Sequence, residues 1–220
     1  MVVKSNYDDA YSEQSIYCYP NTDVLMNSRN IKDPEVLNSV ERMISTYNLS
    51  HLQVEPIKGK FDIEHYFKIH KYLFNDLYPF AGKIRLENMT KGSTPFCRPD
   101  YIHYYLSKTL EKLNNDITKV SNEDEMFEVL AYYYSEINVI HPFREGNGRT
   151  QREFFREFVD AKCNNYEFGN YKIDYNLLNP DGKKYLMNGS IISAATGDTT
   201  LLKEFLKQTI VNTKVQSLKR

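Results

Sequence analysis

The sequence predicts a mostly α-helical fold that carries one short β-hairpin. Apolar residues recur at helical spacing in several separate segments, and a helix-start signal, Asp33-Pro34, precedes the first of them. The 220 residues are 41% apolar, which is enough for one well-filled hydrophobic core or two small ones. The charges nearly cancel, with 28 Lys and Arg against 29 Asp and Glu. This balance excludes a strongly basic nucleic-acid binder and gives no electrostatic reason to expect a membrane-surface protein.

The chain is predicted to begin with an irregular arm over residues 1–30, which lack a steady apolar period. A helix is predicted from Pro34, with Asp33 as its N-cap. Its apolar stripe is predicted to consist of Val36, Leu37, Val40, Met43 and Ile44. A second helix is predicted to begin near Asp62, with a broad apolar stripe that continues to Phe74, and Tyr78-Pro79 is expected to end it.

Residues 81–97 interrupt the helical pattern. The segment 84–87 alternates in polarity and the segment 91–95 is rich in turn residues, so a short hairpin or flap is predicted here. Helical spacing returns in five later segments, 100–113, 123–140, 149–161, 179–195 and 199–211. Since no repeat or linker divides the chain, residues 31–215 are predicted to form a single domain.

The three cysteines, Cys18, Cys97 and Cys163, lack any metal-binding spacing and are predicted to be reduced thiols of a cytosolic protein. The N-terminus turns acidic where a signal peptide would turn apolar. No apolar run approaches the ~20 residues that span a bilayer. A protein made in the cytoplasm is therefore expected.

Residues 141–152, HPFREGNGRTQR, are the segment from which chemistry is predicted. Pro142 disfavours the helical conformation in the residue before it, so the preceding helix is expected to end at His141 with the imidazole at the loop. Gly146 and Gly148 flank Asn147 and allow positive φ, so backbone amides can turn toward one point. The next helix begins here and adds the positive end of its dipole.

Charged side chains complete the predicted site. Arg149 and Arg152 lie three residues apart and project from one helix face, which predicts a phosphate-binding cradle. Glu145 would repel phosphates, and Mg²⁺ resolves this conflict because it binds carboxylates together with phosphate oxygens. His141 is then predicted to be the general base that deprotonates an incoming hydroxyl. These features predict phosphoryl or nucleotidyl transfer.

Two other residues of this segment are given no chemical role. Phe143 is expected to point inward and Arg144 to point to solvent. Each fragment alone is typical of an ordinary feature, such as a packed histidine, a turn or a solvated helix face. Their combination over one contiguous stretch favours function. The segment is not a Walker A loop, because no Lys follows its last Gly.

Residues 141–152 resemble the complete signature of the Fic family, H-P-F-x-[DE]-G-N-G-R-x-x-R. The segments 61–74 and 81–85 are also similar to those that precede the motif in this family, and the resemblance covers roughly residues 15–205. It implies a Fic-type helical domain that transfers AMP from ATP to a Tyr, Thr or Ser hydroxyl of a target protein and releases pyrophosphate.

The resemblance implies a role for each motif residue. His141 would be the catalytic base, and Glu145 would hold Mg²⁺ between the α- and β-phosphates of ATP. Residues Gly146–Gly148 would form the anion nest, and Arg149 and Arg152 would bind the outer phosphates.

The segment Lys91-Gly92-Ser93-Thr94-Pro95-Phe96 resembles the target-docking flap of the family. A strand edge there would accept an extended peptide by main-chain hydrogen bonds. Lys91, Gly92, Ser93 and Thr94 would also contact the nucleotide. The alternative is an ordinary surface turn.

Many Fic proteins are restrained by an inhibitory helix of pattern [ST]-x-x-x-E-[GN]. Segments that begin at Ser107, Ser121 and Thr200 match its first half, but none has Gly or Asn after the Glu. We therefore expect a small antitoxin-like protein to supply the inhibitory helix in trans.

The segment 17–22 resembles toxin-type Fic proteins and type IV secreted effectors. Such relatives suggest a topoisomerase subunit or a small GTPase as the target. They also suggest a bacterial cytoplasmic location, with delivery into a host or recipient cell by a secretion system. Two alternative functions stay open. The predicted cradle contacts the phosphates of a nucleotide and not its base, so UTP or a CDP-linked donor could replace ATP. A non-catalytic module that binds peptides through the flap is the other alternative.

Overall fold

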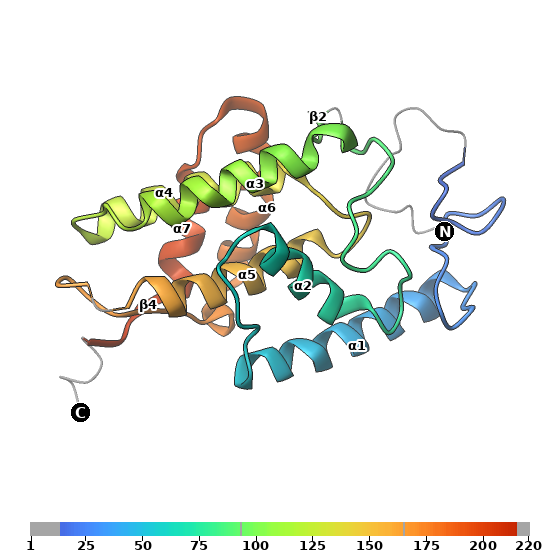
Figure 1. Ribbon diagram of the computed structural model, residues 1–220, viewed down its shortest axis with the longest axis horizontal. Coiled ribbons are helices and arrows are strands. Elements are labelled where there is room, and N and C mark those ends of the chain that lie inside the picture. Colours follow the sequence, from blue (N-terminus) through green and yellow to red (C-terminus); the bar gives the residue numbers. More distant parts are fainter. Residues whose placement is uncertain (1–13, 93, 165, 215–220) are drawn as a thin grey trace. The chain divides into compact units, whose positions relative to one another are not determined.

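The computed structural model describes residues 14–92, 94–164 and 166–214, and Figure 1 labels the helices α1 to α7 and two of the strands. Helices dominate these residues, as predicted, and the strands are short. The helices are α1 (Pro34–Val54), α2 (Ile63–Phe74), α3 (Pro99–Asp116), α4 (Glu123–Ile140), α5 (Asn147–Lys162), α6 (Pro180–Thr196) and α7 (Thr200–Thr209), with a 3₁₀ turn η1 (Tyr175–Leu177). The strands are β1 (Thr90–Lys91), β2 (Thr94–Pro95), β3 (Tyr171–Ile173) and β4 (Ile210–Asn212).

The chain divides into two compact units. The first contains the chain up to Tyr105 together with Ile140–Thr150, and the second contains Leu106–Val139 and the chain from Gln151 onward. The single domain predicted over 31–215 stays a prediction, as does the arm over 1–30. Residues 1–13 and 215 lie outside the described part of the chain.

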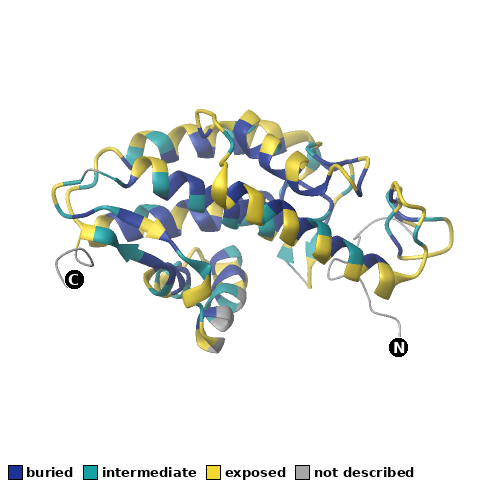
Figure 2. Cartoon of the chain, turned by 90° about the horizontal axis from the view of Figure 1, so that it is seen from below, coloured by how far each residue is buried: buried dark blue, intermediate teal, exposed yellow. Residues whose placement is uncertain are grey.

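In the first unit, α1 begins where its capping signal predicts. The Asp33 carboxylate accepts hydrogen bonds from the backbone N–H groups of Glu35 and Val36. The predicted apolar stripe is confirmed at Leu37, which is buried, but it is wrong at Val36 and Met43, which are 49% and 68% exposed. Figure 2 shows the buried and exposed faces of the helices. The buried face of α1 instead consists of Leu37, Glu41, Ser45, Asn48 and Leu52.

Helix α2 packs against α1 in the same unit (Figure 1). The Asp62 carboxylate caps its first turn, and Asn48 of α1 donates to the carbonyls of Tyr72 and Leu73 near its end. The buried residues of α2 include His65 and His70.

The segment 81–97 contains the predicted hairpin but no strand at Ile84–Glu87. Strands β1 and β2 pair antiparallel, with Thr90 opposite Pro95 and Lys91 opposite Thr94. Residues 84–87 instead contact the segment before α1, because Leu86 donates its backbone N–H to the Tyr17 hydroxyl at 2.8 Å. Their alternation does not mark a strand with a buried apolar side, because Leu86 is 73% exposed and Arg85 is 1% exposed.

The second unit has a phenylalanine-rich core. Phe154, Phe155 and Phe158 of α5 are fully buried, as their spacing predicts. Strands β3 and β4 pair antiparallel, with Lys172 opposite Val211, and were not predicted. Each has three residues and a partner about 40 positions away, so no local pattern marks them. Among the described residues, no helix is both long enough and apolar enough to cross a membrane.

Candidate active site

His141 follows α4 directly, because α4 ends at Ile140 and Pro142 comes next. Its φ is +47°, a left-handed conformation that closes the helix. The imidazole is stacked on the Phe96 ring, with centroids 3.9 Å apart and an interplanar angle of 9°. His141 is 5% exposed, so the predicted base sits at a helix end with its ring orientation fixed by Phe96.

The loop after His141 is closed by one side chain. The Asn147 carboxamide accepts from the Phe143 backbone N–H at 2.8 Å and donates to the Phe143 carbonyl at 2.7 Å. Phe143 is fully buried and stacks on His70 at a centroid distance of 3.7 Å, which confirms that it points inward. The loop therefore has a fixed curvature.

Gly146 is the glycine that this curvature requires. Its φ is +79°, and a Cβ there would lie 2.3 Å from the Phe74 ring. Gly148 was also expected to provide positive φ, but it lies in the first turn of α5, which begins at Asn147. Amides of a first helical turn have no intrahelical acceptor and face the positive end of the dipole. This arrangement suits an anion.

Glu145 lies at the same helix start. Its Oε1 accepts from the Gly146 N–H at 2.8 Å and is 3.5 Å from Nη2 of Arg149. Burial raises the pKa of the Glu145 carboxyl, the neighbouring Glu41 charge raises it further, and Arg149 opposes the shift. The side chain is 29% exposed, so the carboxylate still reaches the surface.

Arg149 is anchored on α1. Its Nη2 donates to Oε1 of Glu41, and its Nη1 donates to the Ser45 hydroxyl at 2.9 Å. The guanidinium also lies 4.8 Å from the centre of the Phe74 ring. Glu41, Ser45 and Phe74 were not predicted as site residues. The only sequence signal was that polar residues occur every three or four positions along α1.

Arg144 was predicted to point to solvent, and this is wrong. It is 3% exposed, and its Nε lies 3.9 Å from Oε2 of Glu87. The reason is the pairing of the loop with the segment that precedes the hairpin, since the Arg85 N–H donates to the Pro142 carbonyl at 2.9 Å. This pairing places Arg144 against Glu87 instead of water.

Arg85 joins His141 to the base of the hairpin and was not predicted as a site residue. It is 1% exposed, and its Nε donates to the His141 carbonyl at 2.9 Å. Its other donors reach the carbonyls of Glu87, at 2.5 Å, and Cys97. One buried guanidinium therefore ties together three backbone segments.

The His70 side chain contacts both the motif loop and the segment after α2. Its Nε2 lies 2.9 Å from the Glu145 carbonyl, and its Nδ1 accepts from the Gly82 N–H at 2.7 Å. Only the neutral ring protonated at Nε2 satisfies both contacts, because a proton on Nδ1 would face the Gly82 donor. Burial, opposed by the Glu145 hydrogen bond, lowers the pKa of His70 to about 3.

A pH dependence of stability follows from His70. The lowered pKa means that the unfolded chain binds a proton below pH 6.5 while the folded chain does not, so stability is lost as the pH falls below that value. We expect a loss of about 1.4 kcal/mol per pH unit, or about 2 kcal/mol at pH 5. Urea unfolding at pH 7 and pH 5 measures this, with His70→Gln expected to flatten the difference and the exposed His51→Gln to keep it. An unchanged difference in His70→Gln would contradict the assignment.

The hairpin contributes to the site through Phe96, which stacks on His141. Lys91 and Gly92 are exposed, and Gly92 has a φ of +60° with open space around it. Ser93, predicted as a flap and nucleotide-binding residue, lies outside the described residues. The roles predicted for the remaining flap residues, Lys91 to Phe96, stay predictions.

Arg152 belongs to the second unit. Its backbone carbonyl accepts from the Tyr175 hydroxyl at 2.8 Å. Burial raises the pKa of the neighbouring Tyr134 to about 12, and Arg152 opposes this shift. Its predicted phosphate-binding role stays a prediction.

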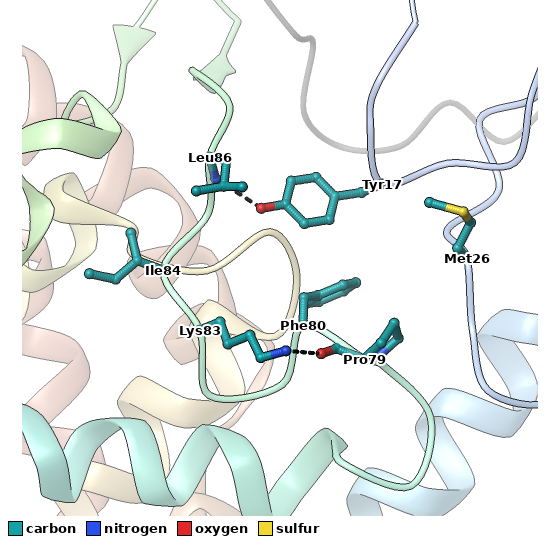
Figure 3. A pocket seen from close by; sticks show the side chains of 7 residues that line it. All are labelled: Tyr17, Met26, Pro79, Phe80, Lys83, Ile84 and Leu86. Carbon is teal, nitrogen blue, oxygen red and sulfur yellow. Dashed lines mark hydrogen bonds between the residues drawn. The ribbon is translucent and has the colours of Figure 1, made fainter.

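A cavity of about 350 Å³ lies elsewhere in the first unit (Figure 3). Its walls are the residues Tyr17, Met26, Pro79, Phe80, Lys83, Ile84 and Leu86. The Lys83 ammonium donates to the Pro79 carbonyl at 2.9 Å, and the rings of Tyr17 and Phe80 meet edge to face. The cavity therefore shows how the arm packs on the segment 79–86, and the motif loop does not line it.

The three cysteines are free, and Cys18 and Cys163 are buried while Cys97 is partly exposed. Among the described residues, no group of three or more His, Cys, Asp or Glu side chains could hold a metal by itself.

Comparisons with known proteins agree with this geometry. The sequence profile of the Fic/DOC family matches residues 60–159. The chain is 30% identical over 195 residues to "Probable protein adenylyltransferase y4lH" of Sinorhizobium fredii, which covers 88% of this chain and 94% of that protein. It is also 31% identical over 195 residues to protein adenylyltransferase VbhT of Bartonella schoenbuchensis. That alignment covers 88% of this chain but only 38% of the relative.

The fold has counterparts among solved structures. The N-terminal Fic domain of a VirB-translocated Bep effector protein from Bartonella quintana, solved with bound ADP, has a TM-score of 0.78 and 27% identity to this chain. The match covers 92% of this chain and 97% of that domain. Helical fold, motif loop and sequence identity thus lead to one conclusion: this chain belongs to the Fic/DOC family.

Proposed function

We propose that this chain is a protein adenylyltransferase that transfers AMP from ATP to a side-chain hydroxyl of a target protein. The observation that carries the proposal is the complete 141–152 motif, whose histidine ends one helix while the following loop opens the next. The relatives named above as adenylyltransferases, and the ADP in the Bartonella quintana domain, support this reading.

Each motif residue then has a defined task. His141 takes the proton of the target hydroxyl while the oxygen bonds to the α-phosphorus and the bond to the β-phosphate breaks, which releases pyrophosphate. The amides of Asn147 and Gly148, at the start of α5, hold phosphate oxygens, and Gly146, whose N–H donates to Glu145, gives the nest its positive φ. Arg149 and Arg152 bind the outer phosphates and orient the α-phosphate.

The position of Glu145 suits a carboxylate that binds Mg²⁺. Mg²⁺ in nucleotide sites is held by one or two carboxylates plus phosphate oxygens, so a single carboxylate that reaches the surface suffices. The 29% exposure of Glu145 and its place at the anion-binding helix start meet this need. When bound, the metal would neutralise phosphate charge that the carboxylate would otherwise repel.

The exposed hairpin fits the docking of the target peptide. Lys91 and Gly92 of the hairpin are exposed, and a two-residue strand pair leaves main-chain groups for an added strand. We further propose a small GTPase or a topoisomerase subunit as the target class and a small antitoxin-like protein as an inhibitor in trans. Bacterial cytoplasm, with delivery by a secretion system into a host or recipient cell, is the proposed location.

The position of a radioactive label tests the proposed reaction. The chain is incubated with Mg²⁺, lysate proteins and ATP labelled at either the α- or the γ-phosphorus. Label is expected on protein only from the α-position. Transfer from the γ-position would replace the proposal with phosphoryl transfer, and transfer only from UTP or a CDP-linked donor would change the donor. No transfer from any donor would favour the peptide-binding module.

A further inference from the structure

A charged pair connects α1 to the motif loop within the first unit. Arg149 donates to Glu41 from Nη2 and to Ser45 from Nη1. The side chains of Arg149 and Glu41 are 20% and 11% exposed, so water screens this pair weakly. A glutamate on the buried face of a helix is costly unless it is paired, and Arg149 provides that pairing.

Glu41 is itself held in place by a second contact. The Tyr78 hydroxyl donates to Oε2 of Glu41, while Oε1 accepts from Arg149. Burial and the adjacent Glu41 charge raise the pKa of Tyr78, so the hydroxyl keeps the proton that it donates. The carboxylate therefore has both oxygens fixed, which leaves it one orientation toward Arg149.

Arg149 lies between two carboxylates and favours one of them. Its Nη2 bonds directly to Glu41 but lies 3.5 Å from Oε1 of Glu145. A charge-assisted hydrogen bond is normally about 2.7–2.9 Å long, so the contact with Glu145 is loose. Without Glu41, the guanidinium would be free to close on Glu145.

We propose that Glu41 is a positioning residue of this site, which anchors Arg149 on α1 and so keeps Glu145 out of a full ion pair. The inference rests on the proposed function, because it assigns Arg149 and Glu145 to the nucleotide phosphates and their metal. Glu41 acts through Arg149 and does not touch the nucleotide itself.

The first test removes the charge of Glu41 and keeps its size. Glu41→Gln is expected to raise the Kd for ADP, measured by isothermal titration calorimetry with Mg²⁺, about ten-fold. The KM for ATP is expected to rise by a similar factor with little change in kcat. Glu35→Gln, on the exposed start of the same helix, is the matched control and is expected to leave both constants unchanged. An unchanged or lower Kd in Glu41→Gln would overturn the inference.

A double variant separates positioning from general packing. In an Arg149→Gln background, Glu41→Gln is expected to change the ADP Kd less than about two-fold, because Glu41 acts through Arg149. A purely structural role would repeat the ten-fold loss there, and that result would overturn the inference.

Tyr78→Phe removes the hydroxyl that holds Glu41 and keeps the ring. It is expected to raise the ADP Kd about two- to five-fold, since the carboxylate loses one of two anchors. If Glu41→Gln does not fold, an unchanged Kd in Tyr78→Phe decides against the inference. A wild-type chain that binds ADP but transfers no label contradicts the proposed function alone, and the Kd series still decides on Glu41. A wild-type chain that binds no ADP contradicts both.

Discussion

Replacing His141 by alanine is expected to lower the rate of AMP transfer roughly 10²–10⁴-fold, because the target hydroxyl loses the base that accepts its proton. The backbone contact of His141, from Arg85 Nε to its carbonyl, does not use the ring. The variant is therefore expected to fold and to bind ADP within about two-fold of the wild type. Initial rates with α-labelled ATP measure the first effect and calorimetry measures the second.

His103→Ala is the matched control for this variant. His103 lies on α3 in the same unit and is exposed, so its loss is expected to leave the transfer rate unchanged. A His141→Ala chain that retains more than about a tenth of the wild-type rate would fall short of the contribution of a general base and contradict its role.

Replacing Arg85 by methionine is expected to lower the free energy of unfolding by roughly 3–5 kcal/mol. Methionine fills a similar volume, but the carbonyls of Glu87, Cys97 and His141 would each lose a charged donor in a buried place. Urea unfolding at pH 7 measures the change. The transfer rate is also expected to fall, because His141 would lose the contact that fixes its left-handed backbone.

Arg42→Met serves as the control for Arg85. Arg42 is exposed on α1 and its side chain donates to the nearby Asn38 side chain, so a change within about 0.5 kcal/mol is expected. Arg85→Lys keeps the positive charge, but all of its N–H donors are on one nitrogen atom. It is therefore expected to recover only part of the free energy of unfolding that Arg85→Met loses. An Arg85→Met chain that unfolds at the wild-type urea concentration would show that the three contacts contribute little.

The helices and the motif loop could be predicted because their determinants are local. Helix α4 spans the predicted residues 123–140, since its apolar spacing and the proline after His141 both act within a few positions. The positive φ of Gly146 follows from the absence of a Cβ, whereas the left-handed conformation of His141 was not predicted, because a following proline favours an extended backbone.

The supports of the loop could not be predicted, because they are distant in sequence. Glu41 lies 108 positions from Arg149, and Arg85 lies 56 positions from His141. The periodicity of α1 indicated a helix but not which face would be buried. The apolar stripe predicted from hydropathy therefore included Val36 and Met43, whereas the structure exposes them and buries Glu41.

The sequence by itself determined the helical class, the position of the hairpin and the residues of the motif, because proline, glycine and helical spacing restrict the backbone over a few bonds. Only the tertiary structure decided which partners hold those residues: Phe96 against His141, Arg85 beneath it, and Glu41 on Arg149. It also decided that Arg144 is buried. A buried charge is stable only when folding brings an oppositely charged partner to it, and a local sequence pattern does not indicate which distant segment provides that partner.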